Sequence, residues 1–300
     1  MEANKFWLFD VFTRKRYFGN QLAIVDSQAK LSTETMLRIA AEFGYSETVF
    51  MECSGTGETD FDMRIFTPTT ELDFAGHPTL GAIAKWLMVD LKPSPGEEKT
   101  VRIGQNIGGV EVSGSLVSET EARCEFVLPL KPECREAPVA VGDIARMLGI
   151  KAGDIGFAGC QAMQVTAGPS FLFVPVASEK ILYQAVLDTT VWEDCLASTD
   201  CPNLYVFTQT DCEHYHARMF APAMGQAEDA ATGAAAGGLA AYLNAGLHSQ
   251  NSYNAGTIHQ GVFLGRDSEL KFQYEETLNE VRRIMVSGYA VIVAEGVLYV

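Results

Sequence analysis

The sequence predicts an α+β protein of two pseudo-symmetric modules, each with a mostly antiparallel sheet wrapped around a central helix. Three observations lead to this fold class. The chain has 300 residues, about twice the length of a typical domain. Many short segments have strand patterns and few long ones have helical patterns, which disfavours a doubly wound parallel fold. A segment of the first half also reappears in the second half.

The first half is expected to contain short strands and two helices. Apolar or alternating runs bounded by turn residues indicate the strands, and Gly19-Asn20 marks the first turn. Ser32 or Thr33 can cap the first helix, and Pro78 suits the first turn of the second. Strands are predicted at 5–12, 20–26, 46–52, 61–68, 100–104, 108–113 and 121–129, helices at 32–43 and 78–88, and an exposed loop at 91–99.

The second half is expected to follow a break at 131–138, which contains two prolines and four charged residues. We therefore predict modules 1–130 and 131–286, with a last strand near 287–300 that is free to pack with the first module. Within 131–300 the patterns predict helices near 141–149, 180–187 and 230–245, strands near 161–166, 170–176, 203–208 and 213–220, and mostly strand over 256–300.

An internal repeat joins the two halves. Residues 64–87 read RIFTPTTELDFAGHPTLGAIAKWL, and residues 218–243 read RMFAPAMGQAEDAATGAAAGGLAAYL. Both begin Arg-x-Phe-x-Pro and pass through a loop into an Ala-rich helix. With a gap of two residues, His77 lies opposite Asp229 and Gly81 opposite Gly233. The matching order of strand, loop and helix indicates a duplication.

The repeat predicts where an anion would bind. If the halves face each other about a pseudo-two-fold axis, the N-termini of the two repeated helices point into one cleft. Each N-terminus has backbone N–H groups without helical partners and a partial positive charge of roughly half a unit. Two of them directed at one point would bind a carboxylate without lysine or arginine.

Composition restricts the function and the location. The formal net charge is -16, from 22 basic and 38 acidic residues, which disfavours nucleic acids and anionic membranes as partners. No apolar run reaches the length of a membrane span, and the N-terminus has no signal-peptide pattern. The seven cysteines are scattered without a C-x-x-C motif. Reduced thiols in a cytoplasmic protein are therefore expected.

Motifs for other chemistries are missing from the sequence. It contains no Walker A, H-E-x-x-H or G-x-S-x-G motif, and the glycines of 104–109 lack the G-x-G-x-x-G register. His214 and His216 alternate along a predicted strand with no third ligand nearby in the sequence, so we expect one face of a strand and not a metal site.

Six segments together resemble the successive signatures of the phenazine-biosynthesis PhzF-like isomerase/epimerase family. The combination of Ser-Glu-Thr, Gly-His-Pro and Glu-Asp-x-x-Thr-Gly is specific. The resemblance implies a fold similar to diaminopimelate epimerase, an active site between the modules, catalysis without a cofactor and a homodimer. The segments are 10–25, 39–50, 64–82, 218–243, 259–270 and 286–293.

Glu47 is the principal catalytic candidate. It lies at a predicted helix-to-strand transition beside apolar residues, where partial burial would raise the pKa of its carboxyl toward neutrality. Without a family resemblance, a surface glutamate at the start of a strand is the more usual interpretation. The family resemblance gives its motif glutamate the role of general acid and base.

His77 and Asp229 head the two repeated helices, and we expect them to form a polar pair that assists Glu47. Asp229 also fits a plain N-cap. The same resemblance indicates further substrate-binding residues, with backbone or hydroxyl donors at the two helix starts. They are Asn20, Ser46, Gly76, Thr232 and Gly233.

Two alternative functions remain open on the sequence. A two-thiol amino-acid epimerase or racemase of the same fold needs a cysteine in each facing turn, and AGHP and AEDAA contain none. A non-catalytic protein that binds a small ligand is compatible with Ala234, which stands where the family often has serine. The leading hypothesis is an isomerase that moves a proton on a small carboxylate-bearing substrate.

Overall fold

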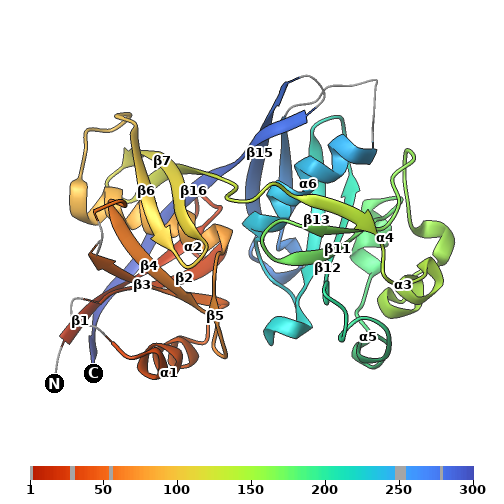
Figure 1. The fold of residues 1–300 in the computed structure, drawn as a ribbon, viewed down its shortest axis with the longest axis horizontal. Coiled ribbons are helices and arrows are strands. Elements are labelled where there is room, and N and C mark those ends of the chain that lie inside the picture. The colour runs from red at the N-terminus through yellow and green to blue at the C-terminus, as the bar shows by residue number, and fades with distance from the viewer. Residues whose placement is uncertain (1–2, 28–30, 54–56, 247–254, 278–279) are drawn as a thin grey trace. The chain divides into compact units, whose positions relative to one another are not determined.

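The computed structural model describes residues 3–27, 31–53, 57–246, 255–277 and 280–300 (Figure 1). The chain forms two compact units. Unit 1 comprises Met1–Pro129 and Val286–Val300, and unit 2 comprises Leu130–Met285. Each unit combines a sheet with a central helix, so the predicted α+β fold class of two pseudo-symmetric modules is confirmed.

Unit 1 is a sheet that closes on itself. Its strand order is β1-β2-β3-β4-β6-β7-β8-β16, and β16 also pairs with β1. Closure leaves no open sheet edge on this path for another chain to pair with. The strands are β1 (Ala3–Val11), β2 (Asn20–Asp26), β3 (Glu47–Cys53), β4 (Phe61–Phe66), β5 (Glu71–Leu72), β6 (Lys99–Gln105), β7 (Gly108–Ser118), β8 (Glu121–Val127) and β16 (Glu280–Tyr299).

Helix α1 (Thr33–Phe43) covers one side of the unit 1 sheet. Ser32 caps it by accepting a hydrogen bond from the backbone of Thr35, and Gly44 ends it in the left-handed conformation. Its buried residues, Met36, Ile39 and Ala40, recur at helical spacing and pack on buried residues of β2, β3 and β4. This helix is therefore amphipathic, and the sequence prediction of 32–43 is confirmed.

Helix α2 (Gly76–Lys85) lies inside the closed sheet, as Figure 1 shows. All ten of its residues are buried, which is the pattern of a helix that is surrounded on every side. Gly81 permits a close approach to β2, because a Cβ atom at this position would collide with the side chain of Leu22. The helix continues into a π-helical turn, Trp86–Leu91, which precedes the predicted loop.

Unit 2 repeats the connectivity of unit 1. Its strand order is β16-β15-β14-β13-β12-β11-β10-β9, in which β11–β12 and β13–β14 are parallel, as are β2–β3 and β4–β6 in unit 1. Its elements are β9 (Glu133–Glu136), α3 (Val141–Leu148), β10 (Met163–Thr166), β11 (Ser170–Pro175), α4 (Glu179–Gln184), α5 (Thr189–Cys195), β12 (Asn203–Gln209), β13 (His214–Phe220), α6 (Gly233–Gly246), β14 (Ala255–Gln260) and β15 (Ser268–Thr277).

Each parallel pair is a crossover through helices. In both units the first crossover passes through helices that cover the sheet, α1 or α4 with α5, and the second passes through a central helix, α2 or α6. The antiparallel pairs include β1–β2, β1–β16, β3–β4, β6–β7, β7–β8, β9–β10, β10–β11, β12–β13 and β14–β15. Each central helix therefore starts just after the strand that carries the Arg-x-Phe motif, β4 or β13.

Three sequence predictions need correction. The break at 131–138 contains β9, which pairs with β10; its residues are mostly charged and mostly exposed, so they give no apolar signal. Helix α5 lies in a segment for which no element was predicted, and it has no fully buried residue. Helix α6 begins at Gly233, three residues after the predicted start. Residues 278–279 of the predicted strand region lie outside the described residues.

None of the helices in the described part of the chain has the length and apolar character needed to cross a membrane.

Candidate active site

Glu47 is placed by the junction of α1 and β3. Gly44 ends the helix with φ of 66°, and its N–H group donates to the carbonyl of Ala40. The chain then enters β3 at Glu47, which lies in parallel register with Leu22 of β2. Glu47 is only 4% exposed. A carboxyl group buried at the end of two parallel strands is thus held in a fixed position.

His77 is the second residue of α2 and faces Glu47. Its Nε2 atom lies 3.4 Å from Oε2 of Glu47, and its side chain is 4% exposed. Burial lowers the pKa of His77 from its ordinary 6.5 to about 3. The imidazole is therefore neutral near pH 7 and lies beside the carboxyl group as an uncharged polar side chain.

Asn20 and Ser46 orient the imidazole. The hydroxyl of Ser46 donates to Oδ1 of Asn20 at 3.1 Å, so the amide nitrogen of Asn20 points to Nδ1 of His77 at 3.3 Å. The ring also forms a hydrogen bond with the backbone of Gln21, and its Nε2 atom lies near Oε2 of Glu47 without a hydrogen bond between them. Four side chains consequently form one connected polar cluster.

The N-terminus of α2 contributes backbone donors to the same cluster. No side chain caps this helix at Ala75, and Pro78 has no N–H group. The N–H groups of Gly76 and His77 therefore supply the positive end of the helix dipole. We name the set of Asn20, Ser46, Glu47, Gly76 and His77 the unit 1 cluster.

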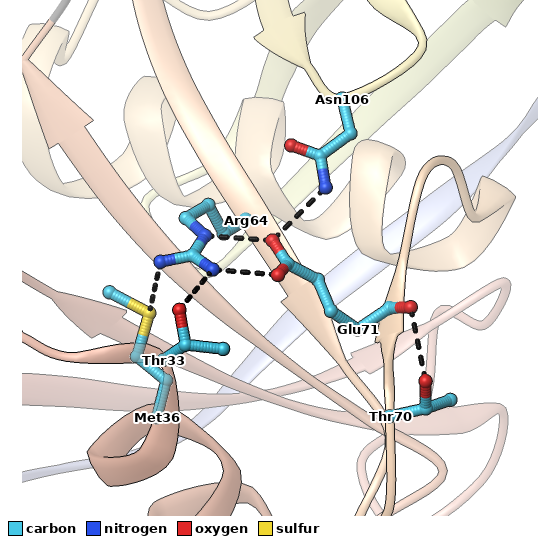
Figure 2. Close-up of polar contacts among 6 residues, drawn as sticks. All are labelled: Thr33, Met36, Arg64, Thr70, Glu71 and Asn106. Carbon is cyan, nitrogen blue, oxygen red and sulfur yellow. Dashed lines mark hydrogen bonds and ion pairs between the residues drawn. The ribbon is translucent and has the colours of Figure 1, made fainter.

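An ion pair holds the loop that leads to α2. Arg64 of β4 donates from Nε and Nη2 to the two carboxylate oxygens of Glu71, at 2.7 and 2.6 Å, and Nη2 also reaches Thr33 of α1 (Figure 2). These hydrogen bonds hold the pKa of Glu71 below its usual range. Asn106 donates to the same carboxylate. The chain before α2 is thereby tied to β4 and to the β6–β7 turn.

Asp229 occupies the corresponding place in unit 2. Its backbone N–H donates to the carbonyl of Met219 at 2.8 Å, and its Oδ2 accepts from the hydroxyl of Thr232 at 2.7 Å. It is 8% exposed. The expectation of a plain N-cap is wrong, because α6 begins at Gly233 and Asp229 belongs to the extended segment paired with β13.

Gln260 fixes this segment. Its amide nitrogen donates to the carbonyl of Asp229 and to the hydroxyl of Thr232, both at 2.9 Å, and its Oε1 accepts from the backbone N–H of Thr232 at 3.3 Å. Asp229, Thr232 and Gly233 are therefore held together at the start of α6. We name these three residues the unit 2 cluster.

The structure thus groups the predicted residues by unit. Asn20, Ser46, Glu47, Gly76 and His77 come together in unit 1, and Asp229, Thr232 and Gly233 come together in unit 2. The predicted polar pair of His77 and Asp229 joins residues of different units and stays a prediction.

In each unit a glutamine that was not predicted contacts the start of the central helix or the residue before it; it is half-buried in unit 1 and fully buried in unit 2. Gln105 at the end of β6 donates to the hydroxyl of Thr79 in α2 at 2.9 Å, as Gln260 at the end of β14 does to Thr232. Both residues stand third in an Ile-x-Gln sequence, at 103–105 and 258–260. Extending the internal repeat to these strands would have identified the two glutamines.

The histidines of β13 have partners other than a metal. His214 contacts Asp211, and Nδ1 of His216 lies 2.8 Å from the hydroxyl of Tyr183. Within the described ranges no group of three or more His, Cys, Asp or Glu side chains is arranged to hold a metal ion. Cys53 and Cys212 are exposed, and the other cysteines also lie outside the two clusters.

Comparison with known proteins identifies the family. The chain is 32% identical to an uncharacterized isomerase of Mesorhizobium japonicum over the whole of both chains. It is 31% identical to trans-2,3-dihydro-3-hydroxyanthranilate isomerase of Pseudomonas aeruginosa over 99% of each. A Bacillus anthracis phenazine biosynthesis protein of the PhzF family has the same fold, with a TM-score of 0.87 and 23% identity over all of both chains. The family model for phenazine biosynthesis-like proteins (PhzC-PhzF) matches residues 9–296, and the chain therefore belongs to this family.

Proposed function

We propose that this member of an isomerase family moves a proton on a small carboxylate-bearing substrate by general acid and base catalysis, without a cofactor. The observation that carries the proposal is the buried contact between Glu47 and a neutral His77 at the uncapped start of α2. Burial places a proton acceptor beside an uncharged imidazole in a region of low dielectric constant, where electrostatic interactions are strong.

The reaction needs no external oxidant or reductant. Glu47 removes a proton from a carbon that is activated by a neighbouring carboxylate or double bond, and the electron pair of the broken C–H bond moves into the conjugated system. The same carboxyl group returns the proton to another carbon on that face. The N–H groups at the start of α2 stabilise the negative charge that develops between the two steps.

Relatives suggest a first substrate to test. Curated relatives with 30–31% sequence identity to this chain are named trans-2,3-dihydro-3-hydroxyanthranilate isomerase. This compound has the carboxylate and the ring double bonds that the proposed chemistry requires. We propose it as a test substrate, and we propose that Asp229 assists the acid through the unit 2 cluster.

The decisive experiment is the Glu47→Gln substitution. It preserves the shape of the side chain and removes the acid and base, so turnover of the test substrate should fall by about 10²–10⁴-fold. Glu52→Gln, on the same strand, is the matched control and should retain wild-type turnover. In D₂O, hydrogen at the new C–H position of the wild-type product would show direct return of the proton by Glu47, and deuterium there would show that the carboxyl group exchanges its proton with solvent first.

Retention of more than about a tenth of the wild-type turnover by Glu47→Gln would exclude Glu47 as the general base. Binding of the test substrate by the wild-type protein without isomerisation or deuterium uptake would indicate a non-catalytic binding protein. A two-thiol racemase remains disfavoured, because no cysteine lies in the clusters.

A further inference from the structure

The peptide group between Ala75 and Gly76 forms the start of α2. Ala75 is the N-cap residue, with an extended backbone at φ of -149° and ψ of 140°. Its carbonyl accepts the hydrogen bond of the first helical turn from the N–H of Thr79 at 3.3 Å, so it points along the helix. The peptide is trans, and its N–H and C=O groups therefore point in opposite directions. The N–H of Gly76 consequently points out of the N-terminal end of α2.

This N–H group is buried without a partner. Gly76 is one of the fully buried residues of α2, and its N–H donates to no residue that the structure describes. Nε2 of His77, the next residue, is also buried and has no hydrogen-bond partner among the described residues. Buried N–H groups in folded proteins nearly always have partners. Two such groups on adjacent residues indicate a place for a ligand atom.

A relay of two hydrogen bonds holds the same peptide from within the helix. The hydroxyl of Thr79 donates to the carbonyl of Ala75 at 2.7 Å. Thr79 is fully buried, and its hydroxyl oxygen accepts from Nε2 of Gln105 at 2.9 Å. Because the single hydroxyl proton goes to Ala75, the group of Gln105 that faces Thr79 must be its amide nitrogen. The relay therefore runs in one direction, from the end of β6 to the start of α2.

The relay determines both the direction and the strength of the Gly76 donor. A peptide group is planar, so fixing the carbonyl of Ala75 also fixes the N–H of Gly76. Hydrogen bonds that are linked in a chain polarise one another, so a carbonyl that accepts from Thr79 makes the N–H of the same peptide a stronger donor. A donor that is oriented before the reaction needs no reorganisation when charge develops beside it.

The helix start of unit 2 is built differently. In the aligned repeats Ala231 stands opposite Thr79, and alanine has no hydroxyl group. The neighbouring hydroxyl of Thr232 donates to the carboxylate of Asp229 and not to a backbone carbonyl. The duplicated central helix thus forms with alanine at this position. Formation of a central helix alone therefore gives no reason for the relay in unit 1.

We propose that Thr79 is a positioning residue for the reaction and that Gln105 supports it. The relay directs the N–H of Gly76 at the negative charge that develops on the substrate when Glu47 removes the proton. Thr79 does not touch the substrate and acts through the peptide that it holds. The inference rests on the proposed function and adds the residues that orient its charge-stabilising donor.

The test compares Thr79→Val with Thr79→Ser in the turnover of trans-2,3-dihydro-3-hydroxyanthranilate. Valine keeps the branched shape and removes the hydroxyl. We expect kcat to fall by about tenfold and KM to change by less than about twofold, because the lost interaction forms only in the transition state. Serine restores the hydroxyl and should return kcat to within about threefold of the wild type.

Gln105→Leu tests the outer bond of the relay from a half-buried position. It removes the donor to Thr79 and leaves α2 unchanged, so kcat should fall by about threefold. Added to Thr79→Val, it should cause no further loss, because both substitutions act through the same peptide. Gln105→Leu also decides the question if Thr79→Val does not fold.

Thr199→Val is the matched control. The hydroxyl of Thr199 donates to the carbonyl of Leu196 at 2.8 Å, just after α5 in unit 2. The substitution removes the same kind of bond as Thr79→Val does. It should lower the melting temperature and leave kcat at the wild-type value.

A folded Thr79→Val protein that keeps more than about a third of the wild-type kcat would overturn this inference and leave the proposed function intact. An unchanged kcat in Gln105→Leu, where Thr79→Val does not fold, would have the same consequence. Equal losses of kcat in Thr79→Val and Thr79→Ser, or in Thr79→Val and Thr199→Val, would assign the hydroxyl a structural role and also overturn the inference. If the wild-type protein does not isomerise the substrate, the proposed function fails and this inference fails with it.

Discussion

The titration of His77 shows how the fold controls a single residue. The ring is 3% exposed, and burial lowers the pKa of His77 to about 3, whereas a histidine in the unfolded chain titrates near 6.5. Between these two values the unfolded chain binds the additional proton. Acidification in this range therefore favours unfolding, and the stability that comes from a neutral His77 is complete only above about pH 6.5.

We predict that His77→Gln weakens the acid sensitivity of the protein. Between pH 6 and pH 4, the free energy of unfolding should fall less steeply in the variant than in the wild type, by up to about 1.4 kcal/mol per pH unit. Urea denaturation at each pH measures the free energy of unfolding. Equal slopes for the variant and the wild type would contradict the burial argument.

Residues of the candidate site differ in how far the sequence alone could identify them. Glu47, His77 and Asp229 lie in motifs or in the internal repeat, so their types and positions were enough. Gln260 lies outside these motifs, and its contact with Thr232 depends on the pairing of β14 with β13, which lies about 40 residues earlier in the chain.

Each unit has one arginine–glutamate ion pair that starts from the strand with the Arg-x-Phe motif. The two pairs differ in how deeply they are buried. In unit 2, Arg218 of β13 donates to both carboxylate oxygens of Glu228 and to the carbonyls of Leu182 and Ala185. The side chains of this pair are 11% and 6% exposed. The corresponding pair of Arg64 and Glu71 is 27% and 23% exposed. Water can therefore solvate the second pair better.

We predict that Arg218→Met destabilises the protein by about 3–5 kcal/mol, because it leaves the buried carboxylate of Glu228 without its partner. Arg64→Met should cost about 1 kcal/mol, as expected for a more exposed pair. The double variant Arg218→Met/Glu228→Met should recover part of the loss, since no buried charge remains. Chemical denaturation measures the free energy of unfolding of all three variants. Similar losses for the two single variants would contradict a role for burial.

Predictability from the sequence also varied among the elements. Helix α1 was located to within a residue because its buried positions follow helical spacing and Ser32 caps it. Strand β9 has charged and mostly exposed residues, and α5 has no fully buried residue, so neither element shows the apolar periodicity from which elements are predicted. The start of α6 was missed because Ala230 and Ala231 are good helix formers that pairing with β13 and Gln260 keeps outside the helix.

On the scale of the molecule, the repeat predicted two modules of one architecture, and the strand orders confirm that fold class. Duplication explains why the central helices, the Arg-x-Phe strands and the supporting glutamines recur in the same order. The two sheets nevertheless end differently: unit 1 closes through β16, whereas β9 stands at the end of the strand order that the structure describes for unit 2. The repeated segments contain no information about this difference, because it depends on the last strand.

The division of the chain predicts that the two units depend differently on the C-terminal strand. Unit 2 is the continuous segment 130–285, whereas unit 1 needs residues 286–300, which pair with β1. A protein of residues 130–285 should therefore unfold cooperatively in urea. Residues 1–129 alone should not, because β1 and β8 then lose the strand that joins them.

Supplying residues 286–300 should restore the fold of the first unit. We expect a fusion of 1–129 to 286–300 through a flexible linker to show a cooperative urea transition and a dispersed NMR spectrum. A fusion with the order of residues 286–300 scrambled is the control and should behave as 1–129 does. If 1–129 alone folded as stably as the fusion, closure of the sheet by β16 would contribute little to unit 1. Because Glu47 and His77 are both held inside this sheet, the same comparison measures how far the candidate catalytic contact depends on the end of the chain.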